Sequence, residues 1–116
     1  GYPYRAPYAA AKWAVIGLMK TLAMELGPHG IRANAICPGA VEGPRMEGVL
    51  QREAEAKGMS RDAVYEGYAA GTSMKAFVTA EDVASMALFL GSPMARMVSG
   101  QVIAVDGHTE NPDPKV

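Results

Sequence analysis

The amino-acid sequence predicts an α/β fold built around a parallel sheet. Helical patterns alternate along the chain with two short apolar runs, residues 31–37 and 101–105, each bounded by glycine or proline. Short apolar runs of this kind are typical of strands covered on both faces, and the alternation of helix and strand is that of βαβ units. The chain supplies two strands and about four helices, so we expect the sheet to need further strands.

The first predicted element is a helix over residues 8–27. Residues 1–7 carry two prolines and read as a loop, while Gly27 and Pro28 supply a stop. Apolar residues recur between these limits at steps of three and four, namely at Ala11, Val15, Leu18, Leu22 and Leu26. This spacing indicates a helix with an apolar face.

Residues 31–37 form the first predicted strand, between Gly30 and Pro38. Residues 38–45 follow with two prolines and two glycines in eight positions, which predicts a loop. A helix, a tight turn and an apolar strand in this order form the second half of a βαβ unit.

Three further helices and a second strand complete the prediction. One short helix is expected over 46–56, and another after Ser60, which is a plausible N-cap. Thr79 is the expected N-cap of a helix over 80–91, with acidic residues in its first turn. The second buried strand is expected at 101–105.

Composition excludes several classes of protein. Lys and Arg total 11 and Asp and Glu total 12, so no basic surface favours nucleic acid. The longest apolar stretch, Trp13–Met19, is too short for a membrane span, and no signal peptide is evident. Cys37 is the only cysteine. It therefore allows no internal disulfide and predicts a reducing, cytoplasmic location.

Tyr8 and Lys12 are the first candidates for chemistry. They stand four residues apart at the start of the predicted helix, which puts both side chains on one face. A lysine cation beside a tyrosine favours the phenolate form, and such a pair can donate a proton to a carbonyl or accept one from a hydroxyl. The same spacing is also common on solvated helices, and that alternative stays open.

Four segments, in order and covering nearly the whole chain, resemble the short-chain dehydrogenase/reductase family. In that family a YxxxK helix precedes a strand that reads N-x-I/V-x-P-G, and a helix and a last strand follow. The matching segments are Tyr8–Lys12, Asn34–Gly39, Thr79–Ala84 and Ser99–Gly107.

The resemblance implies an NAD(P)-dependent oxidoreductase with a doubly wound, Rossmann-type parallel sheet. The reaction would transfer a hydride between the nicotinamide and a carbonyl or secondary alcohol. Tyr8 would be the catalytic acid/base, and Lys12 would favour its phenolate form and bind the nicotinamide ribose.

The resemblance also implies further cofactor contacts and a substrate lid. Pro38, Gly39 and Val41 would lie beside the nicotinamide, with the backbone of Val41 meeting its carboxamide. Asn34 would hold neighbouring loops in place, and residues 40–77 would form a variable lid over a small-molecule substrate. The choice between NAD and NADP does not follow from this part of the family pattern.

Several family features do not occur in the sequence. These are the glycine-rich phosphate loop, the NNAG segment and the catalytic serine, since Gly1–Pro7 holds no serine. Gly43 and Pro44 stand where many members carry a cofactor-binding threonine. The sequence also begins with Gly1 rather than Met. We therefore expect residues 1–116 to be the carboxyl-terminal portion of a single Rossmann-fold domain, inactive by itself.

The family resemblance implies a homo-oligomer, a tetramer or a dimer. A different reading is a non-catalytic remnant that associates with a partner subunit through apolar surface. The missing phosphate loop favours this alternative, whereas the preserved Tyr8 and Lys12 favour the enzyme.

Other reactive residues have ordinary interpretations. Cys37 is expected to be a buried apolar residue, and His29 to complement the end of the first helix. His108 and Asp106 could belong to a Ser–His–Asp set, but no nucleophile elbow accompanies them. No metal site is predicted, because the histidines and the tail acids Glu110 and Asp113 lack ligand spacing.

The lid region leaves two interpretations open. Its methionines and tyrosines could line an apolar substrate pocket or could simply pack short amphipathic helices. These residues are Met46, Met59, Tyr65, Tyr68 and Met74. The charged residues between Glu47 and Glu66 are expected to form a solvated helix face.

Overall fold

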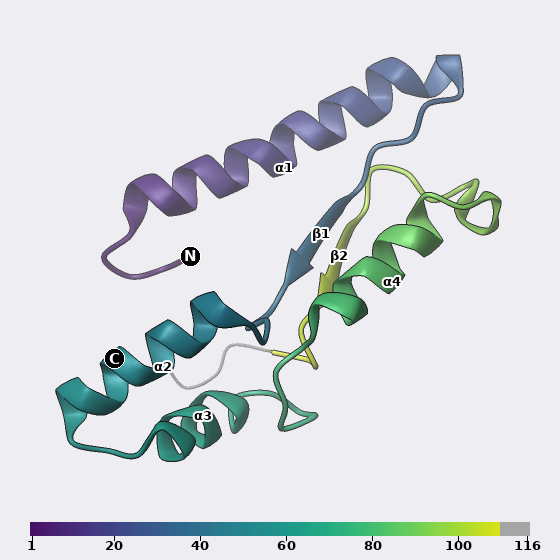
Figure 1. Ribbon diagram of the computed structural model, residues 1–116. Coiled ribbons are helices and arrows are strands. Elements are labelled where there is room, and N and C mark those ends of the chain that lie inside the picture. Colours follow the sequence, from purple (N-terminus) through teal and green to yellow (C-terminus); the bar gives the residue numbers. More distant parts are fainter. Residues whose placement is uncertain (110–116) are drawn as a thin grey trace. The chain divides into compact units, whose positions relative to one another are not determined.

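The structure is a computed structural model that describes residues 1–109 (Figure 1). The tail 110–116, with Glu110 and Asp113, lies outside the described residues. The helices are α1 (Ala6–Leu26), α2 (Pro44–Lys57), α3 (Arg61–Ala69) and α4 (Ala80–Leu90). The strands are β1 (Ala35–Pro38) and β2 (Val102–Val105). Two short 3₁₀ helices, η1 (Gly27–His29) and η2 (Pro93–Ala95), follow α1 and α4.

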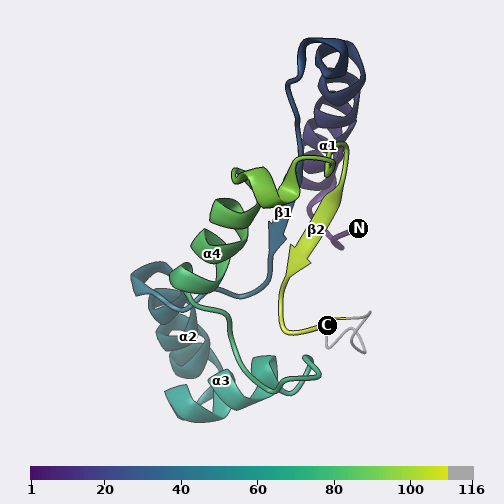
Figure 2. The ribbon, with the colours of Figure 1, turned by 90° about the vertical axis from the view of Figure 1, so that its right-hand side faces the viewer.

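The two strands pair in parallel, and the predicted α/β class is confirmed (Figure 2). The N–H of Ala35 donates to the carbonyl of Gln101, and that of Gly39 donates to the carbonyl of Val105, both at 2.9 Å. The residue numbers increase in the same direction along both strands, from Ala35 and Gln101 to Gly39 and Val105, as in a parallel pair.

β1 is shorter than the predicted strand at 31–37, because residues 31–34 lie outside it. The backbone of Ala33 is bonded to the loop before β2: its carbonyl accepts from the N–H of Gly100 at 2.7 Å, and its N–H donates to Oγ of Ser99 at 3.2 Å. These groups are satisfied by a loop rather than by a strand ladder.

The sequence predicts that both faces of each strand are buried, but the strands are more exposed than this. β1 is half-buried up to an exposed Pro38, and β2 alternates between exposed and half-buried side chains. Alternation of this kind belongs to a strand with one uncovered face. The apolar composition of the two runs is therefore not matched by burial within the described residues.

The chain divides into two compact units. The first contains Gly1–Ile36 and Leu88–Ile103, and the second contains Cys37–Ala87 and the chain from Ala104 onwards. The divisions fall within β1, β2 and α4.

The first unit is built around α1, where the sequence predicts a helix over 8–27. Nζ of Lys20 donates to the carbonyl of Gly100 at 2.8 Å, and the Cβ of Ala23 would lie 3.7 Å from a Cβ on Gly100. Met19 is the buried residue of the helix. Most of its other large apolar side chains are exposed, including Trp13, Val15, Leu18, Leu22 and Met24.

The second unit contains a hairpin of α2 and α3, which pack side by side (Figure 1). Gly58 ends α2 in the left-handed conformation at φ 64°, where glycine is favoured. Oγ of Ser60 then accepts from the N–H of Ala63 at 3.1 Å, so the predicted cap of α3 is confirmed. The core of the hairpin consists of Leu50, Ala54, Val64, Ala69 and Phe77.

α4 begins with a reciprocal cap at the predicted residue. The N–H of Asp82 donates to Oγ1 of Thr79 at 3.1 Å, and the N–H of Thr79 donates to Oδ2 of Asp82 at 2.8 Å. Both groups satisfy backbone donors that the first turn of a helix leaves unpaired.

Candidate active site

Tyr8 and Lys12 lie on one face of the first turns of α1. Nζ of Lys12 is 5.6 Å from the centroid of the Tyr8 ring, which is within the range of a cation–π contact. Tyr8 is 51% exposed, so its hydroxyl is accessible from solvent. The pair is therefore assembled by the geometry of a single helix.

A second cation lies beside Tyr8. The guanidinium of Arg5 is 5.9 Å from the Tyr8 ring centroid and 5.1 Å from that of Tyr2. The two tyrosine rings meet edge to face, with centroids 6.5 Å apart. Sequence reasoning did not single out Arg5, because the residues before α1 carry no periodic pattern.

Gly39 is held against the chain that follows β2. Its N–H donates to the carbonyl of Val105. A Cβ built on Gly39 would lie 2.8 Å from the Cβ and 2.9 Å from the Cα of Asp106. Only a residue without a side chain fits such a close backbone approach.

Val41 lies in an isolated parallel bridge to Val78. The N–H of Val78 donates to the carbonyl of Ala40 at 3.0 Å, and the N–H of Glu42 donates to the carbonyl of Val78 at 2.8 Å. The bridge thus uses the peptide groups on either side of Val41. Within residues 1–109, the N–H and carbonyl of Val41 itself have no hydrogen-bond partner, which leaves both available to a ligand.

The predicted site residues fall in the two compact units. Tyr8 and Lys12 belong to the first, and Pro38, Gly39 and Val41 belong to the second. Within each unit the residues stand as neighbours.

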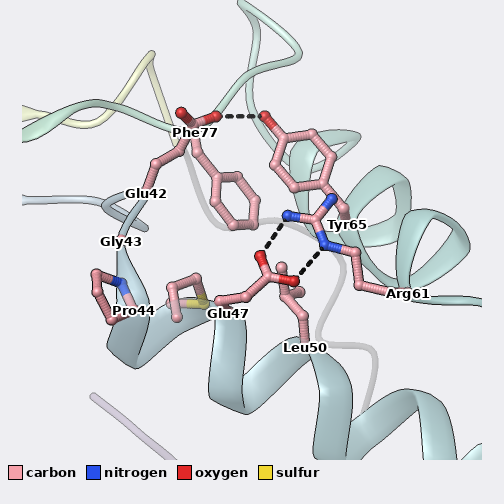
Figure 3. A pocket seen from close by; sticks show the side chains of 9 residues that line it. Glu42, Gly43, Pro44, Glu47, Leu50, Arg61, Tyr65 and Phe77 are labelled. Atoms are coloured by element: carbon pink, nitrogen blue, oxygen red, sulfur yellow. Dashed lines mark hydrogen bonds and ion pairs between the residues drawn. The ribbon is translucent and has the colours of Figure 1, made fainter.

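A cavity of about 470 Å³ opens at the start of the predicted lid (Figure 3). We call it the lid cavity. Leu50 and Phe77 are its most buried lining residues, and the ring of Tyr65 lies 4.3 Å from that of Phe77. The full lining is Glu42, Gly43, Pro44, Met46, Glu47, Leu50, Arg61, Tyr65 and Phe77. A volume of this size is typical of small-molecule sites.

An ion pair joins α2 to α3 at the lid cavity (Figure 3). Nε and Nη2 of Arg61 donate to the two carboxylate oxygens of Glu47 at 2.9 and 2.6 Å, and Nη1 donates to Asp62 at 3.2 Å. The hydrogen bonds from Arg61 hold the pKa of Glu47 below its usual value, and the same bonds raise the pKa of Arg61. The pair is therefore ionised at neutral pH.

Glu42 is the second acidic residue of the lid cavity. Its Oε1 accepts from the hydroxyl of Tyr65 at 3.0 Å (Figure 3). The guanidinium of Arg61 lies 5.1 Å from the centroid of the same tyrosine ring. Tyr65 therefore separates the two charged groups and contacts both.

Most charged residues of α2 and α3 lie on the solvated face that the sequence predicts, namely Arg52, Glu55, Lys57, Asp62 and Glu66. Glu47 and Arg61 differ, because they are half-buried, pair across the hairpin and line the lid cavity. They are 14 positions apart in the sequence, so no local spacing signals the contact. The role of Glu42 was missed for the same reason, since Tyr65 is 23 positions away.

The methionines and tyrosines of the lid divide between the two open interpretations. Met46 and Tyr65 line the lid cavity. Met59 and Met74 are exposed and do not line it, and Tyr68 donates to Glu53 at 2.6 Å. The apolar-pocket reading thus applies to two of the five residues.

Ser73 and His108 form a separate contact in the second unit. Oγ of Ser73 lies 2.5 Å from Nδ1 of His108, and the N–H of Ser73 donates to the carbonyl of His108 at 3.0 Å. Oδ1 of Asp106 accepts from the backbone N–H of His108 at 2.9 Å. The Asp106 bond is to main chain, whereas a catalytic relay uses the histidine ring.

The remaining candidates keep structural surroundings. Cys37 is a free, half-buried thiol, and His29 lies in the last turn of η1, directly after α1. Among residues 1–109, no three His, Cys, Asp or Glu side chains come together as a metal site. None of the helices in this part of the chain combines the length and hydropathy needed to cross a membrane.

Comparison with known proteins gives relatives that include several named dehydrogenases and reductases. A family model described as enoyl-(acyl carrier protein) reductase matches residues 1–108. D-beta-hydroxybutyrate dehydrogenase from Rhizobium meliloti (strain 1021) is 37% identical over 106 residues, which are 90% of this chain and 41% of the relative. The chain belongs to the short-chain dehydrogenase/reductase family.

Solved structures agree with this assignment. L-sorbose reductase from Gluconobacter frateurii, complexed with NADPH and L-sorbose, matches with a TM-score of 0.86 and 27% identity over 95% of this chain and 42% of its own. A 4-hydroxyisoleucine dehydrogenase complexed with NADH matches with a TM-score of 0.68 and 29% identity over 93% of this chain and 40% of its own. The chain therefore spans about two fifths of the length of these relatives.

Proposed function

We propose that the protein containing this chain is an NAD(P)-dependent oxidoreductase that interconverts a carbonyl compound and a secondary alcohol. The observation that carries the proposal is the Tyr8–Lys12 pair on one face of α1, in a chain of this family. Relatives complexed with NADPH and with NADH support a nicotinamide cofactor of either kind.

Tyr8 is the proposed proton donor and acceptor. When bound, the nicotinamide supplies or receives the hydride at the substrate carbon. In the reductive direction the Tyr8 hydroxyl gives its proton to the substrate oxygen, and solvent restores that proton afterwards. In the oxidative direction the phenolate accepts the proton of the alcohol. A phenol half-exposed on a helix can exchange protons with solvent in either case.

Lys12 is proposed to hold charge beside Tyr8 and to bind the nicotinamide ribose. Its ammonium lies near the ring, and a cation there stabilises negative charge on the phenolic oxygen. Three N–H donors leave it able to bind a ribose hydroxyl at the same time. Arg5 adds a second positive charge near Tyr8.

Pro38, Gly39 and Val41 are the proposed nicotinamide neighbours. The backbone N–H and carbonyl of Val41 are turned away from the Val78 bridge, and a carboxamide offers one donor group and one acceptor to match them. The glycine at 39 keeps the main chain in this position without a side chain. These features fit the cofactor.

The chain holds no phosphate loop and no catalytic serine of the family pattern. Because it spans about two fifths of its relatives, we assign both to the remainder of a longer protein. The 116 residues alone are then proposed to be inactive.

We further propose a cytoplasmic homo-oligomer, a dimer or tetramer. The single cysteine suits a reducing compartment. The exposed apolar side chains of α1, such as Trp13 and Met24, favour burial against other protein. The same surface supports the alternative, a non-catalytic chain that associates with a partner subunit.

The test is the Tyr8→Phe variant of the full-length protein, assayed with NADH and NADPH against small ketones. Loss of the phenolic proton should lower kcat by roughly a hundredfold or more, while cofactor binding measured by fluorescence titration is largely kept. Tyr4→Phe is the matched control, because Tyr4 is 95% exposed and outside the proposed site. Turnover by Tyr8→Phe at the wild-type rate would contradict the proposal.

Lys12→Met tests the second residue. Both cofactor affinity and turnover should fall, since one side chain is proposed to serve both. A rate whose pH dependence superimposes on that of the wild type would exclude the electrostatic role of Lys12.

A further inference from the structure

We propose that the lid cavity receives the end of the substrate remote from the reacting carbon, and that it selects a neutral, hydrogen-bond-donating end over an anionic one. This inference rests on the proposed function. It is carried by the lining of the cavity, where an acidic acceptor lies beside an apolar floor. Among the lining residues that the structure describes, the one cation, Arg61, is already paired.

The position of the cavity ties it to the reaction. Glu42 and Gly43, which line it, directly follow Val41, the residue whose backbone is proposed to meet the nicotinamide. All three belong to the second unit. The lid cavity therefore begins one residue after the proposed nicotinamide contact, and a substrate bound at the nicotinamide would lie next to it.

The floor of the cavity is apolar. Leu50 is 1% exposed, and Phe77 is 7% exposed beneath the ring of Tyr65. Met46 adds a flexible apolar wall that can adjust to ligand shape. The carbon skeleton of a small substrate would be buried against these groups.

Arg61 is already paired with carboxylates of the protein. Two of its nitrogens are bonded to both oxygens of Glu47, and a third is bonded to Asp62. An anionic substrate would meet a guanidinium whose charge is already balanced by this bidentate pair, which is among the stronger side-chain contacts. The low pKa of Glu47 keeps that partner ionised at assay pH.

Glu42 is the acceptor that remains. One carboxylate oxygen accepts from Tyr65, and within residues 1–109 the other oxygen has no hydrogen-bond partner. A substrate hydroxyl can donate to this oxygen. A substrate carboxylate would instead meet two acidic residues and one paired cation, which is an unfavourable balance.

The N-terminus of α2 acts in the opposite direction, because the start of a helix attracts negative charge. Glu47 already occupies its first turn, and Pro44 has no N–H to offer. A carboxylate of the protein is therefore already present in the first turn of α2.

The experiment compares two ketones that differ only at the remote end. Acetoacetate carries a carboxylate, and 4-hydroxybutan-2-one carries a hydroxymethyl group in its place. Binding of each to the full-length protein is measured calorimetrically with the oxidised nicotinamide present, so that neither ketone can be reduced. Turnover with the reduced cofactor is measured separately.

We expect the hydroxy ketone to bind about tenfold more tightly than acetoacetate, and Glu42→Gln to remove most of this preference. Glu42→Gln keeps an acceptor for Tyr65, removes the negative charge and replaces the other carboxylate oxygen with an N–H donor. Glu55→Gln is the matched control, because it removes the same charge from an exposed position of α2 outside the cavity. The preference should persist in that variant.

Equal or tighter binding of acetoacetate would overturn the inference, and so would failure of both ketones to bind. A preference that survives unchanged in Glu42→Gln would remove Glu42 from the account and overturn it as well. Failure of the proposed function is recognised separately, through absent nicotinamide binding or an unaffected Tyr8→Phe variant.

Discussion

A side chain on Gly39 would occupy space already held by Asp106. The Cβ of such a side chain would lie 2.8 Å from the Cβ and 2.9 Å from the Cα of Asp106. Movement of a flexible side chain cannot relieve this contact, because the opposing atoms are at the backbone and Gly39 is itself bonded to Val105. The loop between β1 and the lid therefore depends on glycine.

Gly39→Ala should lower the free energy of unfolding by about 1–3 kcal/mol through overpacking. Gly67→Ala, in the interior of α3 with nothing within 4 Å, is the control. It should instead add about 1 kcal/mol of stability through helix propensity. Urea denaturation of the full-length protein measures both changes. Equal stability of the two variants would show that the Asp106 contact is relieved.

Asn34 joins the start of β1 to the loop before β2 through both ends of its amide. Nδ2 donates to the carbonyl of Val98 at 2.9 Å, and Oδ1 accepts from the N–H of Gln101 at 3.1 Å. Asn34 therefore holds the neighbouring loop as expected, but it lies just before β1 and is not a strand residue. Asn34→Asp keeps the acceptor but places a carboxylate oxygen against the Val98 carbonyl. It should cost about 1–3 kcal/mol at neutral pH.

The loss of stability in Asn34→Asp should become smaller at acidic pH, because a protonated carboxyl group can again donate a hydrogen bond to the Val98 carbonyl. The difference in unfolding free energy between variant and wild type, followed by denaturation from neutral to acidic pH, measures this. A difference independent of pH would mean that the donor to Val98 is unimportant.

The Arg61–Glu47 pair should contribute stability that depends on pH. The pKa of Glu47 is lowered from 4.5 in the folded protein, chiefly by its hydrogen bond from Arg61. The unfolded state therefore binds more protons between the two values, and the contribution is complete above 4.5 and lost as pH falls through the folded value.

Arg61→Met should remove that contribution. The difference in unfolding free energy between the variant and the wild type should therefore be largest at neutral pH and become smaller on acidification. Arg45→Met is the control, since Arg45 forms no ion pair within residues 1–109. Its gap should not change with pH over the same range. Direct NMR titration of the Glu47 carboxyl carbon checks the shift, and a gap that widens in acid would contradict the assignment.

Local signals were sufficient for the helices. The three- and four-residue apolar spacing placed α1, and Ser60 and Thr79 were recognisable as caps because a capping side chain bonds within three residues. The sequence predicts a strand at residues 31–34 because they begin a mostly apolar run, 31–37. What decides their state is the loop at 98–101, more than 60 positions away.

In the candidate site, too, contacts between residues close in sequence could be predicted and contacts between distant residues could not. Tyr8 and Lys12 could be paired from the sequence, because one helical turn brings them together. Glu42, Tyr65 and Arg61 come together only after α2 and α3 fold against each other. Charged residues with no partner at helical spacing look like a solvated face until the hairpin is known.

The bridge between Val41 and Val78 closes the intervening chain into a loop whose two ends are fixed at one point. Changes of length or composition in α2 and α3 need not alter the strands, because the bridge keeps the two ends of this segment paired. The α2–α3 segment can therefore be replaced as one unit while the Val41–Val78 bridge is kept. Grafting the α2–α3 segment of another family member into the full-length protein would test the proposed role of this segment in substrate choice.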